Sequence, residues 1–187
     1  MMFNLFWIKY RYFSGRLKGE FYRWLIILCG GKCGTGLWVG KGVIWKYAPH
    51  HGIDISSNVY FGENTLIDVP INGRIRIGER VKFTYGCVIS ANVRVVIGDF
   101  TLLGEYCSVR DSDHGMKLGV MIYEQEMLLG QVNIGKDCWL GRNVAILRDS
   151  DIGDGVVIGA QSLVSKQKLL PMAVYVGCPA RSVKIRT

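Results

Sequence analysis

The stretch from residue 134 to residue 164 reads IGKDCW LGRNVA ILRDSD IGDGVV IGAQSL V. An aliphatic anchor returns every six positions, at Ile134, Leu140, Ile146, Ile152, Ile158 and Val164. The fifth position of each hexad is small or β-branched, as at Cys138, Val144, Ser150, Val156 and Ser162. A period of six matches neither the 3.6 of a helix nor the alternation of a strand. It predicts a chain that runs straight, turns and repeats, with three hexads closing one coil and the coils stacking through parallel strands.

The same spacing extends toward the N-terminus, with anchors at Ile55, Phe61, Ile67, Ile77, Phe83, Ile89, Ile97, Leu103 and Val109. We therefore predict an all-β fold, a parallel β-helix over residues 37–165, with the anchors pointing inward. The Gly that often follows an anchor is expected to permit a tight turn. Short insertions before Ile77 and Ile97 are predicted to be small bulges at corners. The long gap at 115–133 is predicted to be an inserted loop, which in solenoids often lines a binding site.

The two ends of the chain lack the repeat. Residues 1–36 are aromatic and basic, and they predict one or two short amphipathic helices, whereas residues 166–187 form a C-terminal tail. Residues 1–50 hold eight of the 23 Lys and Arg but only one of the 15 acids, so the net charge of +8 is concentrated there. Residues 1–29 are predicted either to lie on an anionic membrane surface or to cover the unpaired strand edges of the β-helix.

Composition excludes several functional classes. Uneven basic charge argues against a nucleic-acid binder, and no apolar run approaches the roughly 18–20 residues of a membrane span. The start of the chain lacks the pattern of a secretory signal. The six cysteines lack the spacing of a zinc site or a disulfide framework, and Cys87, Cys107 and Cys138 fall on the packing position of their hexads. We expect no metal, free thiols and a reducing cytoplasm.

Three segments carry a family resemblance: residues 134–144 (IGKDCWLGRNV), residues 152–160 (IGDGVVIGA) and residues 176–181 (VGCPAR). With the hexads, they resemble the hexapeptide-repeat acyltransferases, in particular the xenobiotic, galactoside, maltose and surface-polysaccharide O-acetyltransferases. The resemblance implies a left-handed β-helix and a homotrimer. It also implies that acetyl-CoA, as co-substrate, and a sugar or glycan acceptor meet in a cleft between subunits.

The segment Asp111-Ser-Asp-His-Gly115 supplies a candidate for the chemistry. Moving an acetyl group to a hydroxyl requires a base, and an imidazole with an ordinary pKa near 6.5 suits that role. His114 lies at the junction where the family has its base, although a surface turn would also accommodate a histidine. Asp113, or alternatively Asp111, is predicted to orient the imidazole, unless these carboxylates cap a turn.

The rest of the predicted site is implied by the resemblance. The backbone N–H groups of Gly141 and Arg142 would stabilise the oxyanion. Coenzyme A would contact Trp139, Ala160, Lys166, Pro179 and Arg181, and the acceptor would contact Thr84, Tyr123 and Gln125. The alternatives are corner packing for Trp139, a solvated basic tail for Lys166 and Arg181, and a subunit contact for the loop. Thr84 stands where galactoside enzymes have Asn, which leaves the acceptor open.

Together these features predict a cytoplasmic, acetyl-CoA-dependent O-acetyltransferase acting on a sugar hydroxyl in bacterial surface polysaccharide synthesis. One alternative is an N-acetyltransferase acting on a nucleotide-linked amino sugar, because an amine needs less help from a base. A second is a non-catalytic β-helix scaffold. A Cys–His acyl-enzyme is disfavoured because the thiols occupy packing positions, and a three-histidine zinc site is disfavoured by the spacing of His50, His51 and His114.

Overall fold

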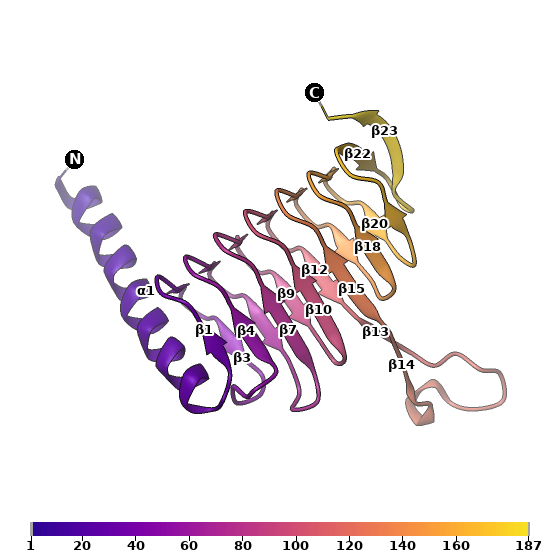
Figure 1. Cartoon of the computed structure of the whole chain (residues 1–187), viewed down its shortest axis with the longest axis horizontal. Coiled ribbons are helices and arrows are strands. Elements are labelled where there is room, and N and C mark those ends of the chain that lie inside the picture. Colours follow the sequence, from indigo (N-terminus) through magenta and orange to yellow (C-terminus); the bar gives the residue numbers. More distant parts are fainter. Residues whose placement is uncertain (1, 187) are drawn as a thin grey trace.

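The computed structural model describes residues 2–186, with side chains from residue 9 onward. Figure 1 shows one helix followed by a stack of triangular coils, which confirms the predicted parallel β-helix. Each coil contributes one short strand to each of three sheets, here called sheets A, B and C. The strands of each sheet pair in parallel with those of the coils before and after.

Among the described residues, sheet A contains β1 (Lys32–Cys33), β4 (Ile53–Ile55), β7 (Arg74–Ile77), β10 (Arg94–Ile97), β15 (Gln131–Ile134), β18 (Ser150–Ile152) and β21 (Lys168–Leu169). Sheet B contains β2 (Trp38–Val39), β5 (Tyr60–Phe61), β8 (Lys82–Phe83), β11 (Leu102–Leu103), β16 (Trp139–Leu140), β19 (Val157–Ile158), β22 (Ala173–Val176) and β23 (Arg181–Ile185). Sheet C contains β3 (Ile44–Trp45), β6 (Leu66–Asp68), β9 (Val88–Ser90), β12 (Ser108–Arg110), β17 (Ala145–Ile146) and β20 (Leu163–Val164). Only β23 pairs antiparallel within these sheets, against β22.

The core is a column of the predicted anchors, all of which are buried. Phe61 stacks on Phe83 at 5.1 Å between ring centroids, and Leu103, Leu140 and Ile158 continue the same column in register. Burying each such side chain contributes about 1.5–3 kcal/mol relative to exposure. The six-residue spacing therefore follows from the need to return one large apolar side chain to the axis on each side of the prism.

The glycines that directly follow anchors are needed because the adjacent coil leaves no room for a Cβ, and they do not have a positive φ. This corrects the expectation from the sequence that they permit a tight turn. A Cβ at Gly104 would lie 2.8 Å from the backbone nitrogen of Arg142 in the next coil. The left-handed corner residue comes later in the hexad, for example at Asn143 (φ 59°) and Tyr106 (φ 60°).

The ends of the β-helix and one of the two short insertions differ from the prediction. Pairing begins at β1, before residue 37, and continues through β22, past residue 165. Before Ile97 there is no corner bulge, because the extra residues lengthen the flanking strands β9 and β10. Before Ile77 the corner itself is longer, with residues 69–73 between β6 and β7.

The inserted segment is a hairpin that projects from the corner between sheets C and A (Figure 1). Its strands β13 (Ser112–His114) and β14 (Met127–Leu129) pair antiparallel, and the connecting loop contains the short 3-10 helix η1 (Ile122–Glu124). Strands β10 and β15 pair directly across this insertion, so the stack of coils is unbroken.

Helix α1 (Met2–Leu28) is one long helix instead of the one or two short ones predicted. It packs against β1 and β2, with Ile26 fully buried and the Tyr22 ring stacked on Trp45 at 5.5 Å. Gly15 and Gly19 allow the approach, because a Cβ at Gly19 would overlap the Leu37 carbonyl. The helix thus covers the first coil. Within residues 2–186, no helix combines the length and apolar character needed to cross a bilayer.

We predict that Gly19→Ala destabilises the protein by about 1–3 kcal/mol, the usual cost of overpacking, because the helix must move away from Leu37. Urea unfolding monitored by tryptophan fluorescence measures the change. Lys18→Ala, at an exposed position of the same helix, serves as the control and should stay near wild-type stability. Equal stability of the two variants would contradict this packing.

Candidate active site

His114 is exposed at the end of β13 and lines a cavity of about 670 Å³ at the corner between sheets C and A. The other lining residues are Lys46, Tyr47, Asp68, Ser90, Asn92, Arg110, Ser112, Asp113, Met116, Ile122 and Met127. Cross-strand pairing of His114 with Met127 fixes the backbone that carries the imidazole. The imidazole makes no hydrogen bond within the described part of the chain, so it is available to a ligand in the cavity.

Polar groups from successive coils form a connected wall beside His114. Lys46 Nζ lies 3.0 Å from Asp68 Oδ2, and this hydrogen bond raises the pKa of Lys46. Ser90 Oγ donates to the same carboxylate oxygen at 3.5 Å, and Asn92 Nδ2 donates to Ser112 Oγ at 2.8 Å. Hydroxyl, amide and carboxylate groups at one surface can both accept hydrogen bonds from a polyhydroxylated ligand and donate to it.

The Asp111 carboxylate is buried and serves the backbone. It accepts hydrogen bonds from the N–H groups of Asn92 (2.8 Å), Val93 (2.7 Å) and Arg94 (2.8 Å). These bonds fix the turn between β9 and β10, which places Asn92 in the cavity wall. The structure therefore assigns Asp111 to the turn, the alternative that the sequence left open.

Asp113 is held away from the predicted partnership with His114. Arg148 Nε donates to Asp113 Oδ2 at 2.7 Å, and Arg148 Nη1 donates to Asp149 Oδ2 at 2.7 Å. The Arg148 side chain is 13% exposed, so this contact is better shielded from water than a surface ion pair. It ties the base of the hairpin to the next coil. Within the described residues, neither Asp111 nor Asp113 forms a hydrogen bond with His114.

The hairpin loop is fastened by one of the residues predicted to bind the acceptor. Gln125 Nε2 donates to the carbonyl groups of Lys117 (3.0 Å) and Val120 (2.9 Å), and its Oε1 accepts from the Lys117 N–H at 2.7 Å. Both amide donors are thus consumed inside the loop, so Gln125 shapes the loop and is not free to bind a sugar. Tyr123 is 96% exposed.

The residues predicted to bind coenzyme A and the oxyanion gather partly on sheet B. Trp139 is exposed on β16, Gly141 and Arg142 follow that strand, and Ala160 follows the neighbouring β19. The N–H of Gly141 already donates to the Ile158 carbonyl at 2.8 Å, which removes it from the predicted oxyanion site. The Arg142 N–H has no acceptor among the described residues, and its guanidinium lies over the Tyr106 ring, 5.6 Å from the centroid.

The other residues predicted to bind coenzyme A or the acceptor lie at two corners and at the far end of the β-helix: Thr84, Lys166, Pro179 and Arg181. Thr84 follows β8 on the same corner as Arg142 and donates to the Leu103 carbonyl at 3.0 Å. Lys166 lies at the corner between sheets C and A in the coil that contains β20. Pro179 and Arg181 belong to the turn and strand that close the far end, where Ala180 N donates to the Leu163 carbonyl at 2.8 Å. Within one chain, Thr84 and Arg142 thus occupy a different corner from His114.

His50 and the core cysteines do not compete for catalysis. His50 is buried, its Nδ1 accepts the Gly52 N–H at 3.1 Å and its Nε2 lies 3.1 Å from the Val69 carbonyl, so both ring nitrogens serve the fold. Burial raises the pKa of Cys87 to about 12 and that of Cys107 and Cys138 to about 11. Neutral buried thiols are poor nucleophiles, which supports their packing role.

A family model described as the bacterial transferase hexapeptide, six repeats, matches residues 131–166. This match confirms the resemblance to hexapeptide-repeat proteins that the sequence predicted. The chain is 32% identical over 152 residues to a probable acetyltransferase of Mycobacterium tuberculosis, covering 80% of this chain and 50% of that relative. It is also 29% identical over 157 residues to the galactoside O-acetyltransferase of Escherichia coli K12, covering 78% of this chain and 76% of that enzyme.

Among solved structures, a hexapeptide-repeat acetyltransferase from Vibrio cholerae in complex with acetyl coenzyme A aligns with a TM-score of 0.58 and 25% identity, covering 68% of this chain and 71% of that one. The chain spans 50% and 62% of the lengths of the first two curated relatives. The resemblance to acetyltransferases expected from the sequence is thereby confirmed, and the activity itself is taken up below as a proposal.

The sequence reasoning missed the polar wall of the cavity, which is formed by Lys46, Asp68, Ser90, Asn92 and Arg110. A usable signal was present: Asp68, Ser90 and Arg110 each follow an anchor directly, at a position where other hexads have Gly. The register of sheet C aligns these three residues in successive coils.

We predict that Asp111→Ala lowers the free energy of unfolding by about 2–4 kcal/mol, because three turn N–H groups lose their acceptor. Urea denaturation measures the loss. Asp149→Asn, which removes the charge of an exposed partner of Arg148 and keeps a side chain that tolerates the left-handed backbone at this position, is the control and should cost less than about 1 kcal/mol. A variant Asp111→Ala with wild-type stability and impaired turnover would instead place this carboxylate in the chemistry.

Proposed function

We propose that this protein is an acetyl-CoA-dependent O-acetyltransferase acting on a sugar hydroxyl of a bacterial surface polysaccharide or its precursor. The observation that carries the proposal is the exposed imidazole of His114, which has no hydrogen-bond partner among the described residues and lies in the wall of a cavity lined by polar groups that suit a sugar. The names of the curated relatives, among them a galactoside O-acetyltransferase and a putative lipopolysaccharide biosynthesis O-acetyl transferase of Escherichia coli, support the acceptor class.

In the proposed reaction, His114 accepts the proton of the acceptor hydroxyl as its oxygen attacks the thioester carbonyl. The tetrahedral oxyanion is stabilised by the Arg142 backbone N–H. Collapse of this intermediate breaks the C–S bond and leaves the acetyl ester on the sugar. The imidazolium then returns its proton to the departing thiolate. The backbone pairing with Met127 and the Asp113–Arg148 contact fix the hairpin, so the backbone that carries the imidazole is held in place.

The separation of these groups within one chain supports a homotrimer. His114 lies at the corner between sheets C and A, whereas Arg142 and Thr84 lie at the corner between sheets B and C. A complete site therefore requires a second copy that brings its sheet B corner to the first copy's hairpin. In this arrangement coenzyme A lies along Trp139 and Ala160, with Lys166, Pro179 and Arg181 toward its phosphate end, and Thr84 and Tyr123 face the acceptor.

We predict that His114→Ala lowers kcat by about 10²–10⁴-fold, the range for loss of a general base. Release of free CoA from acetyl-CoA with a panel of sugars and amino sugars measures turnover. Lys117→Ala, at an exposed position of the same hairpin, is the control and should retain wild-type turnover.

Two other results would change the assignment. Turnover on amino sugars alone, little affected by His114→Ala, would make the protein an N-acetyltransferase. Absence of both turnover and acetyl-CoA binding would favour a non-catalytic scaffold.

We further propose that α1 lies on an anionic membrane surface on the cytoplasmic side, in addition to covering the first coil. Its outward side carries a stripe of exposed apolar residues at helical spacing: Phe13, Leu17, Phe21, Trp24 and Leu28. Five basic residues and one acid lie within residues 9–28. A helix with an apolar face flanked by cations fits the boundary between anionic headgroups and acyl chains.

We predict that the protein sediments with vesicles of phosphatidylcholine and phosphatidylglycerol, and that Phe13→Ala combined with Phe21→Ala weakens partitioning by at least ~10-fold, given the transfer free energy of two phenyl groups. Leu170→Ala removes an exposed apolar side chain at the far end of the β-helix and serves as the control. Failure of the wild-type protein to sediment would limit α1 to its structural role.

A further inference from the structure

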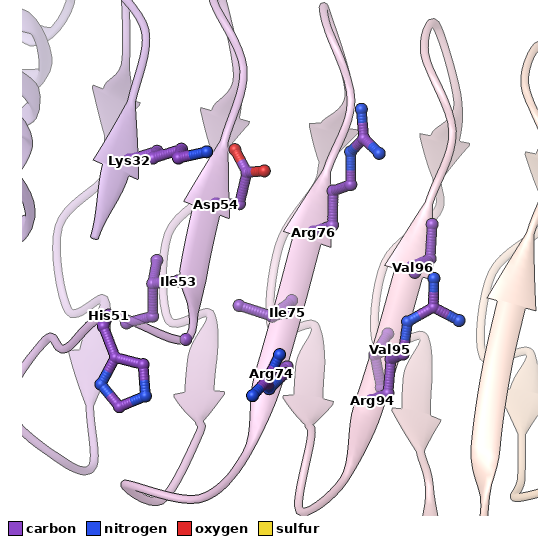
Figure 2. A pocket seen from close by; sticks show the side chains of 11 residues that line it. Lys32, His51, Ile53, Asp54, Arg74, Ile75, Arg76, Arg94, Val95 and Val96 are labelled. Atoms are coloured by element: carbon purple, nitrogen blue, oxygen red, sulfur yellow. The ribbon is translucent and has the colours of Figure 1, made fainter. Parts of the chain in front are cut away.

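A shallow cleft of about 230 Å³ lies on the outer face of sheet A, across β1, β4, β7 and β10 (Figure 2). It is separate from the cavity that holds His114. Its charged or titratable lining residues are Lys32, His51, Asp54, Arg74, Arg76 and Arg94. Four permanent cations therefore face one carboxylate on a single strip of sheet.

The strand register concentrates this charge. Lys32, Asp54 and Arg76 occupy one row across the sheet, so the carboxylate lies between two cations. Figure 2 shows the Lys32 side chain directed toward Asp54. In the next row, Arg74 stands directly opposite Arg94 with no acid beside them. Like charges directly opposite on neighbouring strands destabilise a sheet. The Arg74–Arg94 pair therefore lowers the stability of sheet A, and no acid in that row offsets the loss.

The arginines of the second row lack a protein counter-ion. Among the described residues, no ion pair includes Lys32, Arg74, Arg76 or Arg94. Arg94 Nη1 reaches only the neutral amide oxygens of Gln131 (3.4 Å) and Asn133 (3.3 Å). Farther along the same sheet the pattern differs, because Lys168 lies 3.9 Å from Asp151. The repulsion is thus confined to the cleft.

We propose that this cleft binds the phosphate or diphosphate group of the acceptor. Arg74 and Arg94 stand opposite each other on adjacent strands, and a guanidinium matches the geometry of phosphate oxygens because it can donate two parallel hydrogen bonds. A bound dianion would also remove the repulsion between Arg74 and Arg94. His51, at the edge of the cleft, offers a further donor.

The position of the cleft relates it to the acceptor, a step that rests on the proposed function. Arg94 follows Asn92 by two residues, and Asn92 lines the His114 cavity. The Asp111 carboxylate fixes both residues in one turn through their N–H groups. A sugar at His114 would therefore extend its phosphate around this corner onto sheet A. The predicted acceptor is a sugar joined through phosphate to a larger group, either a nucleoside or a lipid.

Binding of inorganic pyrophosphate to the full-length protein, measured by isothermal titration calorimetry, tests the cleft without reference to activity. We expect Arg74→Gln combined with Arg94→Gln to weaken binding by about 10–100-fold, the range for loss of charge-assisted hydrogen bonds. Lys168→Gln, on the same sheet but outside the cleft, should bind as the wild type does. No binding by the wild type, or equal binding by the double variant, would overturn the proposal. Urea unfolding should show the double variant to be no less stable than the wild type, because repulsion is removed.

Kinetics test the assignment to the acceptor. In the double variant, KM for a phosphate-linked sugar should rise by about 10-fold or more, while kcat and KM for acetyl-CoA stay unchanged. A rise confined to acetyl-CoA would assign the cleft to coenzyme A and overturn the acceptor role, even if pyrophosphate binds.

Turnover with a nucleoside diphosphate sugar in the absence of vesicles identifies a soluble source of the phosphate. Tighter binding to vesicles that contain phosphatidic acid than to vesicles with the same share of phosphatidylglycerol, with this difference lost in the double variant, identifies a lipid-borne source.

Discussion

Return of an apolar side chain to the axis on every side of the prism is the constraint on which the rest of this structure depends. Because Phe61, Phe83 and Leu103 must stack in register, the chain is free to vary only at corners and on outer faces. The hairpin shows how strict this is. A long segment leaves the corner after β12, yet β10 and β15 pair as if it were absent. Functional residues can therefore be placed at a corner without disturbing the parallel strand pairing that supports them.

At the corners, backbone N–H groups need acceptors outside the strands. Polar side chains that supply these acceptors are not available for chemistry. At most corners the N–H groups find carbonyl groups in the adjacent coil. At the turn after β9, three N–H groups converge on Asp111 instead. Asp113 is likewise committed, to Arg148. Two carboxylates flank the candidate base in sequence, but both stabilise the scaffold that presents it. The imidazole of His114 remains the one group in that segment with its hydrogen-bonding capacity unused within the described residues.

The sequence predicted the fold well because the six-residue spacing marks the positions that are buried. Every anchor named from this spacing is buried in the structure. It also located His114 at the edge of the insertion. It did not predict the polar wall, because coils of unequal length align only when the position of each extra residue is known. Asp68, Ser90 and Arg110 become neighbours through that alignment. Nor could spacing show that the Gly141 N–H is spent on Ile158, or that Gln125 turns back into its own loop. These are hydrogen bonds between specific atoms, and the residue types alone do not determine them.

The basic helix α1 and the basic cleft on sheet A lie next to each other in the fold. Helix α1 ends at Leu28, and after Gly30 and Gly31 the chain enters β1, where Lys32 begins the basic cleft. The apolar stripe of the helix and the arginine rows of sheet A therefore belong to the same end of the molecule. Surface charge without local counter-ions raises the local concentration of anionic ligands and speeds their approach. The cleft and the His114 cavity span the same coils on neighbouring faces, so an anionic acceptor held near the helix would be close to both. That arrangement gives one physical reason why the repulsion between Arg74 and Arg94 is kept in this fold.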